Sequence, residues 1–209
     1  MARKFEHDLS DLKDRVLRMG SLVEDAIRKS IKALVERDRD LALAVIDGDH
    51  VINTHDVEIE EECIRLLAIW QPTGSNLRFI TTAIKIITDL ERMGDMAVDI
   101  CERAVELMEE PQLKPYIDIP RMAEASQKML KDSLDAFVDN LTHQIFNELL
   151  VYMLQDPKNI SRAVRLTYIT KYLERIADHA TNIAEMVVYM VKGKVIRHMA
   201  CETREPDVK

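Results

Sequence analysis

The sequence is poor in the two residues that interrupt helices. Its 209 residues include only five glycines and six prolines, although 47% of them are apolar. No proline occurs in residues 1–71, 73–110, 121–156 or 158–205, and in the first of these stretches apolar residues recur at intervals of three and four. That is the spacing of one helix face, and no segment alternates with the period of two that strands require. The sequence therefore predicts an all-α fold.

Other absences exclude whole classes of protein. No apolar run approaches the roughly 20 residues of a membrane span. The N-terminal sequence MARKFEHDLS contains acids, unlike a signal peptide. The 29 basic residues are outnumbered by 37 acids, which gives a net charge of −8. Because this charge repels phosphate backbones, and no basic stripe with interleaved aromatics occurs, we expect no binding to nucleic acid.

Cysteine is also scarce. The three cysteines are an odd number without CxxC spacing, which indicates a reducing cytosol and no disulfide framework. Cys63 and Cys101 lie on or beside apolar helix faces, so we interpret them as packing residues. These features predict a cytoplasmic protein.

Periodicity and punctuation together predict the helices. We expect them at residues 4–47, 50–70, 75–109, 120–140, 141–155 and 158–192. Gly48 is expected to end the first helix, and the turn Gln71-Pro72-Thr73-Gly74 to follow the second. Asp156 followed by Pro157 is typical of an N-cap with proline in the first turn. Short connections imply antiparallel neighbours.

Residues 110–120 hold three of the six prolines, and we interpret them as a linker between two domains. Residues 1–112 are expected to form one antiparallel three-helix bundle, residues 113–193 a second, and residues 194–209 a polar tail. The second bundle is roughly twenty residues shorter, which is several helical turns. Its first two helices abut at Asn140 and Leu141 without a turn residue. We favour a segment missing at this point over a naturally short bundle.

One block of sequence occurs twice, as LERMGDMAVDICERAV and LERIADHATNIAEMVV, at an offset of 83 residues. Besides apolar residues, the copies share the motif Glu-Arg-x-x-Asp, at residues 91–95 and 174–178, and a later glutamate, Glu102 or Glu185. At about 100° per residue, Glu91 points out of the middle of an apolar stripe. A carboxylate without a partner on such a face costs several kcal/mol, so the repeated acids require an explanation.

The preceding helix offers acids to the same interior, since Asp56 shares a face with apolar residues and Glu60 follows at i+4. One interpretation is a buried ion-pair network with Arg92 or Arg175. The other is a metal site, because acids at i, i+4 and i+8 put oxygen ligands in a ladder that a second acidic helix can complete for Mg, Mn or Fe(II). We favour the metal site, because an arginine at i+1 points roughly 100° away from its glutamate.

The histidines exclude one kind of metal site. His143 and His179 are the only histidines near these faces, and neither has Glu-x-x-His spacing. The di-iron oxidases built on helix bundles use that spacing on two helices.

The acidic blocks resemble the PhoU family. The resemblance rests on LERMGDMAVDI, YLERIADHATNIAE, HDVEIEEEC and IWQPTGSNLRFI and covers about residues 5–193. It implies two tandem pseudo-repeated three-helix bundles that bind multinuclear clusters of divalent or trivalent metal ions, with iron, zinc, manganese and magnesium as candidates. By motif, the first metal strip consists of Glu91, Asp95 and Asp99 with Asp56 and Glu60, and the second of Glu174, Asp178 and Asn182.

Two departures from the family pattern leave the metal stoichiometry of the second strip open. Thr142 and Phe146 stand where the first half has Asp56 and Glu60. The family pattern Asp-x-x-Val-Asp, expected ahead of the fifth helix, has no counterpart there, and in the first half it reads Asp49-His50-Val51-Ile52-Asn53.

The resemblance also implies a function. It indicates a negative regulator of phosphate uptake and phosphate-starvation signalling that links a phosphate ABC transporter to a sensor histidine kinase, and that is peripheral to the membrane through these partners. No nucleophile–base pair and no Gly-rich phosphate loop is visible, so we expect an adaptor and not an enzyme. A two-metal hydrolase of phosphate esters and a purely structural helical protein are the alternatives. A homodimer stays open.

Overall fold

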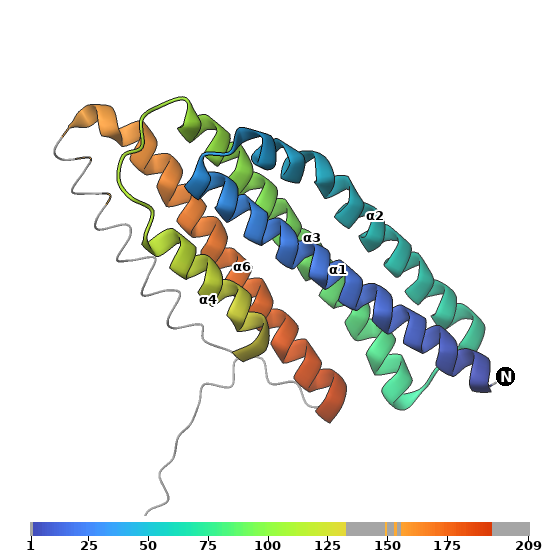
Figure 1. Cartoon of the computed structure of the whole chain (residues 1–209). Coiled ribbons are helices and arrows are strands. Elements are labelled where there is room, and N and C mark those ends of the chain that lie inside the picture. The colour runs from blue at the N-terminus through green and yellow to red at the C-terminus, as the bar shows by residue number, and fades with distance from the viewer. Residues whose placement is uncertain (1, 133–148, 150–152, 154–155, 194–209) are drawn as a thin grey trace, which may run out of the picture.

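The computed structural model describes residues 2–132, 149, 153 and 156–193. Within them the chain is all-α and contains no strand, as predicted (Figure 1). The α-helices are α1 (Ala2–Glu36), α2 (Arg39–Trp70), α3 (Gly74–Met108), α4 (Asp118–Asp132) and α6 (Ile160–Lys192), and a short 3-10 helix, η1 (Pro157–Asn159), precedes α6. None of the described helices combines the length and the apolarity that crossing a membrane requires.

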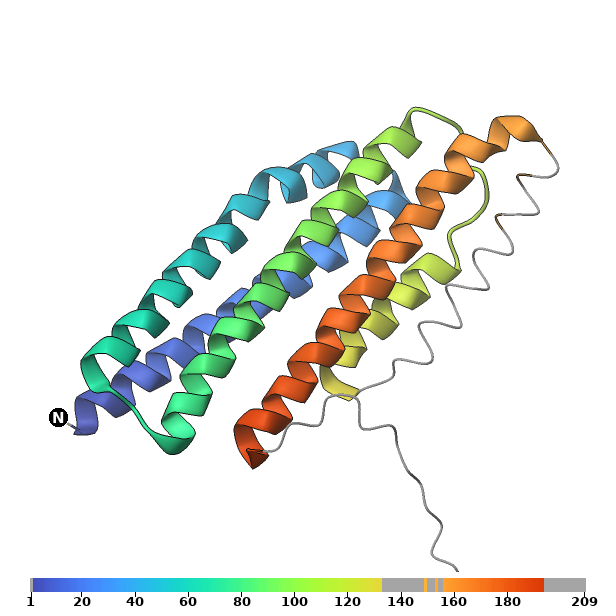
Figure 2. The same ribbon diagram turned by 180° about the vertical axis from the view of Figure 1, so that it is seen from behind.

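Helix α3 is central to the packing. It contacts α1, α2 and α6, while α1 also contacts α2 and α4, and α4 contacts α6. Figures 1 and 2 show α2 on one flank and α4 with α6 on the other, with α1 and α3 between them. The largest fully buried side chains of α1 recur every seven or eight positions, as one helix face requires; they are Leu12, Met19, Ile27 and Leu34. Cys63 and Cys101 are also buried and free, which confirms them as packing residues.

The first two helices are separated at Arg37 and Asp38, so the prediction that Gly48 ends the first helix is wrong. Asp38 is the N-cap of α2, and its side chain accepts a hydrogen bond from the Leu41 amide. Arg37 adopts a left-handed φ of 56°. Gly48 lies inside α2, where a glycine costs about 1 kcal/mol relative to alanine. Capping and tertiary packing outweigh that cost.

The other described boundaries agree with the predictions to within a few residues. Helix α2 ends at Trp70, with Gln71 in a left-handed C-cap. Asp156 accepts a hydrogen bond from the Lys158 amide, with Pro157 in the first turn, as predicted.

Several predictions fall on other parts of the chain. The discontinuity at Asn140 and Leu141, the replacements at Thr142 and Phe146, and the tail at residues 194–209 lie outside the described residues, as does most of the helix predicted at 141–155.

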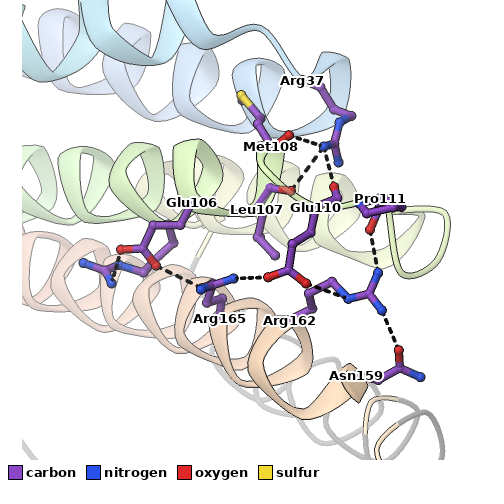
Figure 3. A network of polar contacts seen from close by, with 10 residues as sticks. Arg37, Glu106, Leu107, Met108, Glu110, Pro111, Asn159, Arg162 and Arg165 are labelled. Carbon is purple, nitrogen blue, oxygen red and sulfur yellow. Dashed lines mark hydrogen bonds and ion pairs between the residues drawn. The ribbon is translucent and has the colours of Figure 1, made fainter. Parts of the chain in front are cut away.

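Arg37 ties the connection between α1 and α2 to the end of α3. Its Nη2 donates to the carbonyl oxygens of Leu107, Met108 and Glu110 at 3.2, 2.8 and 2.7 Å (Figure 3). The last carbonyls of a helix have no partner within the helix. Arg37 therefore supplies donors that the end of α3 lacks.

Polar contacts continue from this point to α6. The Glu110 carboxylate accepts a hydrogen bond from Arg165 at 2.9 Å and lies 3.3 Å from Arg162 Nε (Figure 3). Farther along, His179 Nδ1 of α6 lies 2.8 Å from Asp89 Oδ1 of α3, with both side chains largely buried. These contacts, at two levels, fix α3 and α6 in an antiparallel register.

We expect Arg37→Ala to lower the free energy of unfolding by about 2–3 kcal/mol, because it removes a charged donor shared by three carbonyls. Urea denaturation followed by circular dichroism measures the effect. Arg39→Ala is the matched control: Arg39 is exposed, and a positive charge in the first turn of α2 is unfavourable, so stability should stay within about 0.5 kcal/mol of the parent. Equally small effects in both variants would contradict the role given to Arg37.

Candidate functional site

The predicted acids of α3 follow one side of that helix. Glu91 and Asp99 are half-buried, and Asp95 is exposed. Their helical neighbours are core residues; Leu90, Met93, Met96 and Ile100 are all buried. Glu91 and Asp99 therefore lie at the edge of the core, with partly desolvated carboxylates, and Asp95 lies between them on the exposed side of the helix.

Helix α2 contributes the next acids. Asp56 is half-buried and Glu60 is exposed. Burial, and after it the Glu60 carboxylate, raises the pKa of Asp56. Burial also raises the pKa of Glu91, with further contributions from Asp95 and Asp56. Because Asp56 acts on Glu91 across the helix pair, the structure brings together predicted ligands from α2 and α3.

The strip continues along α3. The pKa of Asp95 is raised by burial and by the Asp49 carboxylate. Burial also raises the pKa of Asp99, and the charges of Glu102 and Asp95 add to this effect. Each raised pKa means that the folded protein disfavours the charged form of that carboxylate.

Asp49 belongs to this group, although it was not among the predicted ligands. Its carboxylate raises the pKa of both Glu91 and Asp95. Asp49 Oδ2 accepts a hydrogen bond from Asn53 at 2.8 Å, whereas Oδ1 is buried and has no hydrogen-bond partner. The available signal was its spacing, since Asp49 precedes Asp56 by seven residues and so shares its side of α2.

Gly94 lies between Glu91 and Asp95 and allows α2 to pack closely on α3. A Cβ atom at Gly94 would lie 3.2 Å from Ile52 Cδ1 and 3.5 Å from Asp49 Oδ1. The first distance is tighter than ordinary van der Waals contact. The close approach of the two helices thus coincides with the acids.

The residues that the structure describes do not contain the ion pairs that the ion-pair interpretation requires for the acids of α3. Within the described part of the chain, Glu91, Asp95 and Asp99 form no ion pair with lysine, arginine or histidine. Arg92 lowers the pKa of Glu91, and Arg103 and Arg175 lower that of Asp99, but burial and neighbouring acids outweigh these bases and the net shifts are upward. Among the described residues, the first strip is therefore a group of like charges that nearby bases compensate only in part.

The second predicted strip lies on α6. Glu174 is half-buried, and its Oε1 lies 2.5 Å from Lys171 Nζ. Asp178 is exposed and Asn182 is half-buried. Since Glu174 already has a cationic partner, the charge environment of this strip differs from that of the first.

Among the described residues, no three histidine, cysteine, aspartate or glutamate side chains converge on one point suited to a metal ion. The acids of the first strip are aligned along α2 and α3 and interact through their charges. Holding an ion would require rotation of their side chains, which half-exposed carboxylates undergo readily. In donor chemistry the strip fits a hard or borderline cation, since it offers several carboxylates and an unpartnered buried oxygen of Asp49.

The chain matches known proteins over nearly its whole length. A family model described as the PhoU domain matches residues 16–104 and 137–187. The "Phosphate-specific transport system accessory protein PhoU homolog" of Aquifex aeolicus is 42% identical over 212 residues, which cover 93% of this chain and 96% of that protein.

Two solved structures have the same fold. The crystal structure of PhoU from Pseudomonas aeruginosa superposes with a TM-score of 0.85 at 38% identity and covers 91% of this chain and 100% of that chain. The phosphate transport system regulatory protein PhoU from Streptococcus pneumoniae gives a TM-score of 0.84 at 31% identity, with coverage of 92% and 99%. The protein thus belongs to the PhoU family of phosphate transport accessory and regulatory proteins, which is not a family of enzymes.

Proposed function

We propose that this protein is a metal-binding, cytoplasmic negative regulator of phosphate uptake and phosphate-starvation signalling. In this proposal it acts as an adaptor between a phosphate ABC transporter and a sensor histidine kinase and reaches the membrane through these partners. The names of its relatives support the phosphate part of the proposal, since they are phosphate transport accessory or regulatory proteins.

One observation carries the metal part of the proposal: acids of α2 and α3 are brought together where the helices pack closely at Gly94, and the buried Oδ1 of Asp49 has no hydrogen-bond partner there. In agreement with this arrangement, burial raises the pKa of Asp56, Glu91, Asp95 and Asp99. Carboxylates held together without a base are stabilised by protonation or by a cation. At neutral pH, a bound metal ion relieves their repulsion most effectively.

The ligands proposed for the first site are the predicted acids of α2 and α3 together with Asp49. A bound iron, zinc, manganese or magnesium ion would supply positive charge that neutralises the strip and bridges the two helices. The protein's own contribution is to hold the acids on two packed helices beside Gly94. We propose a second, separate site at Glu174, Asp178 and Asn182 on α6.

We further propose that the chain consists of two pseudo-repeated bundles, residues 1–112 and 113–193. The shared Glu-Arg-x-x-Asp motif supports this arrangement, because its copies lie on α3 and α6. Leu90 and Leu173, at equivalent positions of the two copies, are both buried. Each copy would then organise one metal strip.

The double variant Glu91→Ala/Asp95→Ala tests the metal proposal. In the parent protein, Mn²⁺ should raise the melting temperature and EDTA should reverse the increase, because an ion that binds only the folded state stabilises it. The gain is about 2.7 kcal/mol at a free-ion concentration 100 times the Kd. In the variant this gain should largely disappear, while stability in EDTA should stay level or rise because repulsion is relieved.

The matched control is Glu58→Ala/Glu61→Ala, which removes two exposed acids of α2 outside the strip. It should keep the Mn²⁺ response of the parent. The proposal is wrong if the parent shows no chelator-sensitive melt, or if the strip variant loses stability equally with and without EDTA. The second result would indicate an ion-pair network.

The raised pKa values also predict how stability in EDTA depends on pH. For a carboxyl group whose pKa is higher in the folded than in the unfolded protein, the stabilising contribution is complete below the unfolded pKa and is lost as pH rises through the folded pKa. Stability from this group should therefore increase as pH falls from 7 toward the ordinary values of 3.8 for Asp95 and 4.5 for Glu91.

Glu91→Gln/Asp95→Asn isolates this contribution. In urea denaturation at a series of pH values, the variant should be the more stable protein at pH 7, and its advantage should shrink as pH falls. An advantage that does not change with pH, or that grows in acid, would contradict the assignment of raised pKa values to these two acids.

A further inference from the structure

The outer surface of α2 exposes an apolar stripe. Leu43, Val57 and Ile64 have exposed fractions of 46, 54 and 57%. They are separated by fourteen and seven residues, so they lie along one side of the helix, on which the exposed His50 stands midway between Leu43 and Val57. Within the described chain, α2 contacts α1 and α3 and no other element, and Figures 1 and 2 show it on the flank away from α4 and α6. No described element covers the stripe.

The same stretch carries only one sign of formal charge. Between Arg39 and Arg65 the chain has no lysine or arginine. The formal charge of this segment is −8, the same as that of the whole protein. Its eight acids are Asp40, Asp47, Asp49, Asp56, Glu58, Glu60, Glu61 and Glu62. Arg65 at its end is already engaged by Glu62, at 2.5 and 2.7 Å.

The acids border the stripe on the solvent side. Glu58 and Glu61 are both exposed next to Val57. The only ion pair of Glu58 within the described residues is with His55, at 3.8 Å, and it forms only when the histidine is protonated. The surface is thus an apolar ridge with negative margins.

From these features we infer that the outer face of α2 docks a basic amphipathic helix of a partner protein. Apolar side chains of that helix, repeated over about three heptads, pack against Leu43, Val57 and Ile64, and lysine or arginine residues on its flanks face Glu58 and Glu61. The stripe from Leu43 to Ile64 extends about 32 Å at 1.5 Å per residue, which accommodates a helix of several turns.

The negative charge of this face disfavours three other binding partners: a second copy of the chain, an anionic membrane and a nucleic acid. A second copy packed through α2 would bring the same acids against one another, which is unfavourable. An anionic membrane surface and a nucleic acid are repelled for the same reason. The docking face lies beside the metal strip but uses different side chains, so it stands or falls independently of metal binding.

The test uses a labelled synthetic peptide of three heptads, with leucine at positions a and d and lysine or arginine at e and g. A second peptide with glutamate at e and g is its control. Fluorescence anisotropy in EDTA and about 150 mM salt keeps metal out of the measurement and screens charges beyond roughly 8 Å. The basic peptide should bind the parent protein, and the acidic peptide should not.

Two variants locate the contact. Val57→Ser/Ile64→Ser should weaken binding about tenfold or more, because it removes the apolar anchors. Glu58→Lys/Glu61→Lys should slow association and reduce its salt dependence. Leu17→Ser is the control, since Leu17 is 59% exposed but lies on α1, and it should bind within twofold of the parent. All of these side chains are exposed, and circular dichroism verifies that the variants are folded.

Three results would overturn the inference. One is unchanged peptide binding in Val57→Ser/Ile64→Ser, or an equal loss in Leu17→Ser. Another is a parent dimer that Val57→Ser/Ile64→Ser converts to a monomer in sedimentation equilibrium, because the face would then belong to a second copy. The third is binding of the parent to vesicles of anionic lipid that the same variant abolishes.

Discussion

The constraint on which the rest of this structure depends is the burial of α3 by three other helices. Because α1, α2 and α6 all pack on it, most of the surface of α3 is buried. Its exposed residues form one line along the helix, which includes Lys85, Arg92 and Asp95. Glu91 and Asp99 lie beside this line and are half-buried.

The same constraint explains how the two halves are joined. Where α3 faces α6, its polar residues meet complementary groups: Asp89 meets His179, and Glu106 meets Arg165. Where α3 faces α2, acids meet acids, as the effect of Asp56 and Asp49 on Glu91 indicates. One helix therefore has a self-sufficient polar interface on one side and an only partly compensated one on the other.

Much of the fold follows from periodicity and caps that the sequence displays. The 3/4 spacing and the Asp156-Pro157 pair are local signals, and local signals determine where helices form. The separation of α1 from α2 was predicted at the wrong residue, because Gly48 is a conspicuous breaker whereas the true break depends on Arg37 reaching carbonyls at the end of α3, some seventy positions away. No local pattern contains that contact.

Some features of the candidate site could also be predicted from the sequence, whereas others depend on how the helices pack. The helical phase predicted that Glu91 points out of the middle of an apolar stripe, whereas in the structure Glu91 is only half-buried and Asp95 is exposed. Asp49 was overlooked as a ligand because its neighbour Asn53 broke the expected pair of acids, and its importance arises from the packing of α2 on α3. The partner of Glu174 could have been considered, since Lys171 lies three residues earlier.

Gly94 has a consequence for the position of the acids as well as for packing. The equivalent residue in the second copy of the repeat, 83 positions later, is Ala177, which is also buried. The single hydrogen of Gly94 leaves Ile52 and Asp49 room that a methyl group would occupy. One absent carbon atom thus lets Ile52 and Asp49 of α2 lie against α3 between Glu91 and Asp95, and a methyl group there would have to displace the Ile52 side chain.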